Sequence, residues 1–178
     1  MTATAAVKTA GTVLVTALLT QPLWAPGWGS GVLGEAAAPG LPGAVAAVAV
    51  FFGLVALYCR SLQRTLHLVP SEARTAAPRS VWWMFAIPYN FTEDFFIVRA
   101  VAASLAADGR TAPAAVRRWK ALGYAWCGLQ IASLLPGAVG RAGAAAALLM
   151  WAAHWAVTAR LNRRLAARRP AALQPRTP

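Results

Sequence analysis

Acidic residues are scarce in this chain of 178 residues, which has 5 Asp and Glu against 17 Lys and Arg and a formal net charge of +12. Only 12% of the residues are charged, whereas soluble domains carry about 25%. A well-hydrated soluble surface is difficult to build from this composition. Basic excess also occurs in nucleic-acid-binding proteins, but here the charges flank apolar tracts and form no separate basic domain. We therefore expect no nucleic-acid partner.

Cysteine and histidine are equally rare, with 2 residues of each. Cys59 and Cys127 each lie inside an apolar tract, and their spacing suggests neither a metal site nor a disulfide framework. The sequence also lacks a Walker loop, an H-E-x-x-H zinc motif and a nucleophile elbow. We therefore predict no catalytic residue, no cofactor and no metal site, and hence a non-enzymatic protein.

Long apolar tracts are what the sequence has in abundance, since 58% of its residues are hydrophobic. A helix that spans a membrane needs about 20 mostly apolar residues. Four tracts meet this requirement, at about residues 5–24, 41–59, 119–137 and 141–160. The sequence predicts an all-α integral membrane bundle of four transmembrane helices within residues 1–162. The first tract also has the basic start and apolar middle of a signal peptide, although no clear cleavage site follows it.

Basic residues are distributed unevenly around these tracts. If both termini are cytoplasmic, 16 of the 17 Lys and Arg lie on that side, and only Arg141 lies outside. The positive-inside rule describes this asymmetry. The abundance of Arg and Ala fits a bacterial genome. We therefore predict a multi-pass protein of the bacterial inner membrane, with cytoplasmic N- and C-termini and the lipid bilayer as its solvent.

An interrupted apolar segment, residues 80–107, lies between the second and third tracts. Trp82 and Trp83 suit the headgroup level of a membrane, where an indole buries its ring and keeps its N–H hydrated. The charge distribution requires the segment to begin and end on the cytoplasmic side. Two geometries remain. The segment lies in the membrane interface, which we favour, or it dips between the spans as a re-entrant element.

Pro88 and Asn90 mark the interruption. Proline removes a backbone donor and disfavours helical angles in the residue before it. Asn90 is followed by Glu93 at the spacing of a capping box, which predicts a second helix over about residues 91–107.

The run WWMFAIPYNFTEDFFIVRAV, residues 82–101, resembles a motif with Trp-Trp, Ile-Pro and Asn in bacterial membrane proteins that are grouped as a domain of unknown function. Those proteins have four spans, with the motif between spans two and three. The sequence TED departs from the Leu and aromatic residues expected after the Asn. The resemblance implies a membrane-protein class and supplies no activity.

The candidate functional motif comprises Trp82, Trp83, Pro88, Asn90, Glu93 and Asp94. Glu93 and Asp94 are adjacent acids near a helix start. They form either a cation or proton site, or a pair that stabilises the helix N-terminus and bonds to Arg79 or Arg99. We favour the second interpretation, unless the acids are buried within the bilayer.

His154 is the candidate proton relay, between Trp151 and Trp155 in the fourth tract. A relay needs a second titratable group, and Glu93 is the partner that the sequence suggests. The alternative, which we favour, is a packed or hydrogen-bonded histidine.

The end of the chain, residues 163–178, is predicted to be a basic cytoplasmic tail that is partly disordered beyond Pro170. Four arginines follow helical spacing where the fourth tract continues into this tail: Arg160, Arg163, Arg164 and Arg168. We expect them to contact anionic lipid headgroups, or to act only as a topological stop signal.

Small residues recur at four-residue spacing in the tracts, as in Gly123 and Cys127 or Gly143 and Ala147, which predicts close helix packing. The sequence favours an interaction, scaffold or accessory subunit, whose partner is another membrane protein or a second copy of this chain. The alternative is a small transporter or ion- or proton-conducting protein that uses Glu93, Asp94 and His154.

Overall fold

The computed structural model describes residues 2–29 and 40–168, and within these ranges the protein is helical and has no strand. This confirms the all-α prediction. The long helices are α1 (Ala3–Leu19), α4 (Gly40–Leu68), α5 (Asn90–Asp108), α6 (Pro113–Ala132) and α7 (Gly137–Ala167). The short elements are α2 (Gln21–Trp24), η1 (Pro26–Trp28), η2 (Ser71–Ala73) and η3 (Pro78–Phe85).

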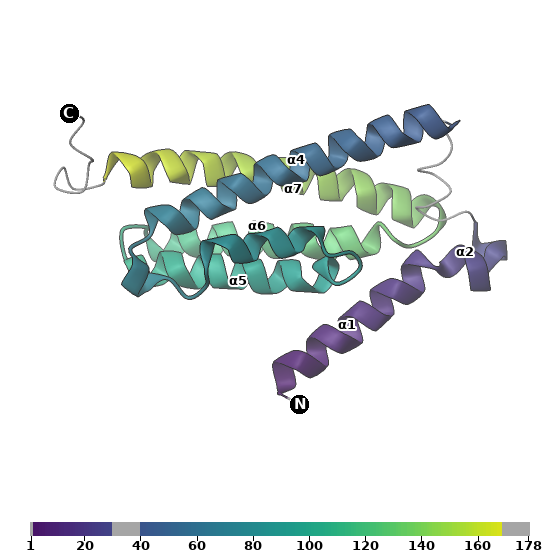
Figure 1. The fold of residues 1–178 in the computed structure, drawn as a ribbon, viewed down its shortest axis with the longest axis horizontal. Helices are drawn as coiled ribbons and strands as arrows, with labels where there is room; N and C mark the ends of the chain where they lie inside the picture. The colour runs from purple at the N-terminus through teal and green to yellow at the C-terminus, as the bar shows by residue number, and fades with distance from the viewer. Residues whose placement is uncertain (1, 30–39, 169–178) are drawn as a thin grey trace.

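Helices α4, α5, α6 and α7 form the bundle (Figure 1). Helices α4 and α7 lie side by side and run in the same direction, whereas α5 and α6 form an antiparallel pair against them. Helix α1 stands apart from these four and contacts the bundle mainly through α5. The bundle is therefore built from chain segments that are far apart in sequence.

The helix boundaries differ from the predicted tracts in three places. The first tract breaks after Leu19, because Pro22 has no backbone N–H to continue α1, and a separate short helix begins at Gln21. The helix formed by the third tract, α6, ends at Ala132 instead of residue 137. Helices α4 and α7 are longer than predicted, with 29 and 31 residues, because polar continuations of the same helices follow their apolar parts.

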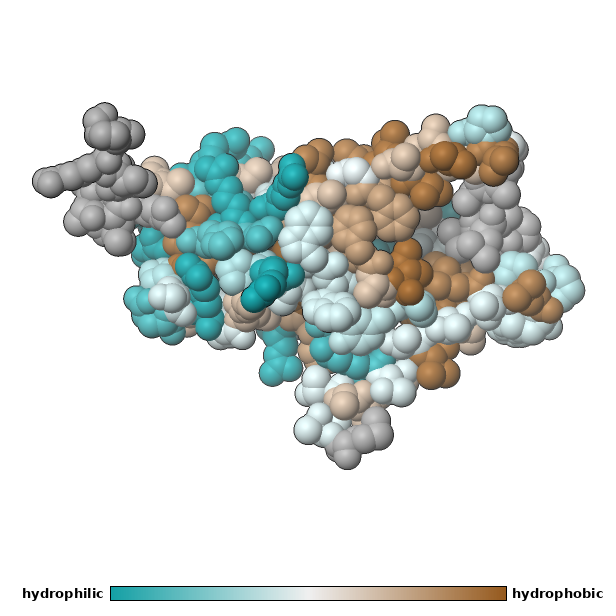
Figure 2. Space-filling view, viewed as in Figure 1, coloured by the Kyte–Doolittle hydropathy of each residue, from teal (hydrophilic) through white to brown (hydrophobic). Residues whose placement is uncertain are grey.

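Helices α4 and α7 are the two helices in the described ranges that are long and apolar enough to cross a membrane, by length and composition alone. Helix α1 is apolar but has only 17 residues. Figure 2 shows hydrophobic side chains over the first half of α4 and hydrophilic ones at the opposite end of the bundle, where α4 and α7 finish. The polarity of the protein thus changes along the bundle axis.

Close packing occurs at some of the predicted small residues. A Cβ added at Gly123 would lie 2.7 Å from Cγ1 of Val98, and one at Gly143 would lie 3.0 Å from the backbone of Ala132. These glycines hold α6 against α5 and α7. At Gly53 and Gly128 an added Cβ would have no neighbour within 4 Å in the described structure.

The interrupted segment runs back along α4. The Trp82 indole N–H donates to Gln63, 3.0 Å away, and the rings of Phe85 and Phe52 stack with centroids 5.7 Å apart. Gln63 and Phe52 are separated by about 16 Å along a helix axis with a rise of 1.5 Å per residue. Side chains of η3 therefore contact points of α4 that lie this far apart, before the chain turns at the cis Ile87–Pro88 peptide and returns as α5.

The predicted capping box is wrong. Helix α5 begins at Asn90, so Asn90 is inside the helix and Tyr89 holds the cap position with no side-chain hydrogen bond. The predicted extent of the helix is confirmed, since α5 ends at Asp108. Gly109 follows it with a φ of 70°, a backbone conformation that suits glycine at a helix C-terminus.

Helix α7 continues without a break to Ala167, as the arginine spacing predicts. The predicted helix stop at Pro170 and the predicted disorder beyond it lie outside the described residues.

Candidate functional site

A buried polar centre lies where α4, α6 and α7 meet, and we define it as Tyr58, Trp119, His154 and Thr158. The hydroxyl oxygen of Tyr58 lies 2.6 Å from Nδ1 of His154. Both side chains are fully buried. The direction of this hydrogen bond depends on the histidine tautomer, because a phenol both donates and accepts.

Two further hydrogen bonds lie on the other side of the centre. The indole N–H of Trp119 donates to the Thr158 hydroxyl, 2.9 Å away, and that hydroxyl donates to the backbone oxygen of His154, 2.8 Å away. The Trp119 and His154 rings lie 4.4 Å apart between centroids. The two hydrogen bonds tie Trp119 to the backbone at His154, and the ring contact packs the Trp119 indole against the imidazole.

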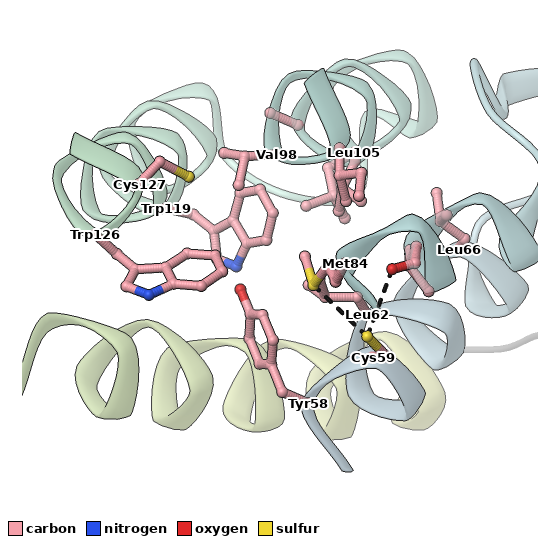
Figure 3. Close-up of a cluster of buried hydrophobic side chains, with 14 of the residues drawn as sticks. Tyr58, Cys59, Leu62, Leu66, Met84, Val98, Leu105, Trp119, Trp126 and Cys127 are labelled. Atoms are coloured by element: carbon pink, nitrogen blue, oxygen red, sulfur yellow. Dashed lines mark hydrogen bonds between the residues drawn. The ribbon is translucent and has the colours of Figure 1, made fainter. Parts of the chain in front are cut away.

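Tryptophans enclose the Tyr58 phenol. The rings of Trp126, Trp151 and Trp155 lie within 5.4 to 6.0 Å of the Tyr58 ring, in edge-to-face arrangements. Figure 3 shows the Tyr58 side chain directed toward the indoles of Trp119 and Trp126. This aromatic wall excludes water, so polar groups inside it depend on protein partners.

A cluster of oxygen acceptors lies nearby, between α5 and α6, and comprises Asn90, Asp94 and Gln130. Asn90 and Asp94 are four residues apart on α5 and therefore lie on the same face. Gln130 of α6 lies beside the Asp94 carboxyl, where its amide favours the ionised form. Within the described ranges, Asn90 Oδ1, Asp94 Oδ1 and Gln130 Oε1 are buried and have no hydrogen-bond partner.

Asp94 is the most deeply buried member of this acceptor cluster, with 1% of its surface exposed. Burial raises the pKa of the Asp94 carboxyl well above its usual range, and the adjacent Glu93 acts in the same direction. The carboxyl also lies within electrostatic range of Tyr58, Cys59 and Cys127. A positive charge that binds here would satisfy both the carboxylate and the acceptors beside it.

Glu93 has a different environment, because its carboxylate forms an ion pair with the Lys8 ammonium of α1. The same ammonium donates to the Tyr89 hydroxyl, 3.1 Å away, and lies 4.6 Å from the centre of the Phe96 ring. The predicted bonds from the acids to Arg79 or Arg99 are therefore replaced by a contact with α1. Lys8 and Glu93 join α1 to the start of α5.

The rest of the predicted motif packs on α4 or faces outward. Trp82 uses its N–H in the bond to Gln63, so this indole does not keep its N–H hydrated as predicted. Trp83 is 56% exposed. Pro88 forms the turn between η3 and α5. The motif thus brings Asn90, Glu93 and Asp94 to the bundle and leaves Trp83 at its surface.

The predicted relay partner of His154 is wrong, because His154 pairs with Tyr58 while Glu93 pairs with Lys8. Sequence reasoning missed Tyr58, Gln130 and Lys8 as members of these sites. Each is a single polar residue in an otherwise apolar stretch, and such residues are costly unless they are paired inside the protein. Both cysteines are free and buried.

No family model, no curated protein and no solved structure matches this chain. The resemblance of residues 82–101 to a domain of unknown function therefore stays a prediction, and the site has to be interpreted from its own chemistry.

Proposed function

We propose that the protein is a small multi-pass membrane protein that binds one monovalent cation or proton at Asp94, in the class of small transporters and ion- or proton-conducting proteins. The observation that carries the proposal is the buried acceptor cluster. One carboxylate and two amide oxygens form a set that hard cations and protons bind. Asp94 Oδ1, Asn90 Oδ1 and Gln130 Oε1 have no donor in the described structure, and the Gln130 amide lies beside the Asp94 carboxylate.

Charge balance favours a single positive charge as the ligand. Glu93 already pairs with Lys8, so among the described residues Asp94 contributes the remaining negative charge of the cluster. A monovalent cation or a proton neutralises it, whereas a divalent cation would leave a net positive charge in a buried site. The amide oxygens of Asn90 and Gln130 would then complete the coordination or accept from the protonated carboxyl.

Helix α4 provides the main support for a membrane location. The most apolar 18-residue window of α4 has a mean hydropathy of 2.2, and none of it is buried inside the protein. The core helix of a soluble protein would be covered, so this surface requires lipid or a partner. We propose four spans, with α1 and α6 as the first and third, both termini cytoplasmic and the inner membrane as the location. The packing of η3 against α4, through Gln63 and Phe52, supports the re-entrant alternative for residues 80–107.

A second candidate is a non-enzymatic interaction or accessory subunit. It is favoured by the same α4 surface, where Phe51, Leu54 and Leu57 are exposed. In this alternative a membrane-protein partner or a second copy of the chain covers α4. The acceptor cluster would then have only a structural role.

Ion flux separates the two candidates. We would reconstitute the protein into vesicles and follow internal pH and Na⁺ with fluorescent indicators, comparing the wild type with Asp94→Asn. Glu72→Gln is the matched control, because Glu72 is an exposed acid on η2. We expect flux in the wild type and in the control, and its loss in Asp94→Asn. Equal flux in all three proteins, or none in the wild type, would favour the accessory subunit.

Topology is tested separately. Reporters at both termini are expected in the cytoplasm, and a reporter inserted after Gly29 is expected outside. A C-terminal reporter found outside would contradict the four-span arrangement.

A further inference from the structure

A basic groove of about 370 Å³ lies at the end of the bundle where α5 and α7 finish. One wall is the last part of α7, and the other is the turn between α5 and α6 with the first two turns of α6. The polar residues that line it, with one indole, are Arg110, Thr111, Trp119, Arg160, Arg164 and Arg168.

The α7 wall combines charge with an apolar surface. Arg160, Arg164 and Arg168 are each four residues apart, so they form one stripe along the helix. The neighbouring stripe is apolar and also lines the groove, through Val157, Leu161 and Leu165. A ligand in the groove therefore meets guanidinium groups on one side and aliphatic side chains on the other.

Little of this positive charge is neutralised. Arg110 pairs with Asp108 at 2.7 Å and donates to the backbone oxygen of Leu68. Arg168 donates to the backbone oxygen of Arg110, 2.8 Å away. The structure forms no ion pair to Arg160 or Arg164 in the described ranges. At least two guanidinium groups thus remain available to an anion.

The opposite wall offers two further features that attract an anion. The Thr111 hydroxyl oxygen is buried and has no hydrogen-bond partner among the described residues. Helix α6 begins beside it at Pro113 without a side-chain cap, and Ala112 and Ala115 of this helix end line the groove. The N-terminus of a helix carries a partial positive charge that favours phosphate groups.

We infer that this groove binds the phosphate group of an anionic phospholipid. Bidentate arginines, a free hydroxyl and a helix N-terminus are the groups that proteins use for phosphate. The apolar stripe on α7 suits the glycerol and the first acyl carbons of a lipid. The phosphate chemistry follows from the groove alone, whereas the lipid as its source rests on the membrane location proposed above.

Binding in a specific groove can be distinguished from general attraction of the whole basic tail to the membrane surface. Arg163 and Arg164 are adjacent, exposed and equal in charge, but only Arg164 lines the groove. Lipid binding in the groove requires Arg164 and does not require Arg163. General attraction to the membrane surface requires both equally.

The experiment measures lipid binding to the purified detergent-solubilised protein by native mass spectrometry and by the thermal unfolding midpoint. The probes are phosphatidylglycerol, phosphatidylcholine and inorganic phosphate, and the variants are Arg164→Gln, Arg163→Gln and Thr111→Val. We expect phosphatidylglycerol to bind and to raise the midpoint. Arg164→Gln should weaken this binding about five-fold, equivalent to about 1 kcal/mol, and Thr111→Val should weaken it less. Arg163→Gln should bind like the wild type.

Three results would overturn the inference. Equal weakening in Arg163→Gln and Arg164→Gln would indicate surface attraction only. Absence of phosphatidylglycerol binding to the wild type would exclude the site. An equal rise in midpoint with inorganic phosphate would assign the groove to a soluble phosphate ligand, and would leave the ion-binding proposal at Asp94 unaffected.

Discussion

The Tyr58 hydroxyl of α4 lies 2.6 Å from Nδ1 of His154 on α7, which links two parallel helices inside the aromatic wall. The imidazole also packs against the Trp119 ring, whereas its Nε2 is buried with no hydrogen-bond partner in the described ranges. One ring nitrogen is thus paired and the other is directed at the α5–α6 interface, where Gly123 lies.

Tyr58→Phe should destabilise the protein by about 1 to 3 kcal/mol, because it leaves the buried Nδ1 of His154 without its partner. Thermal unfolding in detergent measures the effect. Tyr124→Phe is the matched control, since Tyr124 contacts Phe95 and Lys120 through its ring. Equal destabilisation by the two substitutions would contradict a specific role for the Tyr58 hydroxyl.

Gly123→Ala should cost about 1 to 3 kcal/mol through overpacking. The added Cβ would lie 2.7 Å from Cγ1 of Val98 and 3.1 Å from Nε2 of His154. Gly128→Ala, on the same helix, should be neutral or stabilising by up to about 1 kcal/mol, because its added Cβ has no neighbour within 4 Å in the described structure. Unfolding midpoints of the two variants are compared, and a reversed order would contradict the observed packing of α6.

Lys8 and Glu93 should show a coupling energy of about 0.5 to 3 kcal/mol in a double-mutant cycle. Lys8→Met or Glu93→Gln alone leaves a mostly buried charge without its partner. The destabilisations of the two single variants should therefore add up to more than the destabilisation of the double variant. Lys120→Met, combined with Glu93→Gln, is the control and should be additive. Additivity of the Lys8 pair would mean that the ion pair does not hold α1 on α5.

Asp94 should make stability depend on pH. Its pKa in the folded protein is raised by burial, so the folded state holds the proton more tightly than the unfolded state does. The free energy of unfolding is therefore greatest below the usual Asp pKa of about 3.9 and falls by at most about 1.4 kcal/mol per pH unit up to the raised pKa.

Unfolding midpoints across a pH series, with choline in place of Na⁺, test this prediction. Asp94→Asn should remove the decline, whereas Glu72→Gln should retain it. If Na⁺ binds at Asp94, its addition above the usual Asp pKa should restore stability in the wild type and in Glu72→Gln, but not in Asp94→Asn. A decline that persists in Asp94→Asn would assign it to another group.

The helices were predictable because apolar tracts and the Pro88–Asn90 interruption are local signals. The extent of α5 was predicted as residues 91–107 and is Asn90–Asp108, although the capping box behind the prediction is wrong. The partners of the polar residues were not predictable. Spacing shows that Asn90 and Asp94 share a face, but it does not show that Gln130 covers that face. Lys8 and Glu93 likewise meet only because α1 folds back onto α5, which no local pattern specifies.

The unbroken course of α7 has a mechanical consequence. His154 in the buried polar centre and Arg164 in the basic groove belong to the same rigid helix, about 15 Å apart along its axis. A rotation of α7 imposed at its arginine end would therefore turn the imidazole by the same angle. Because α7 also packs against α4 and α6 along this length, such a rotation would have to break the hydrogen bond between His154 and Tyr58.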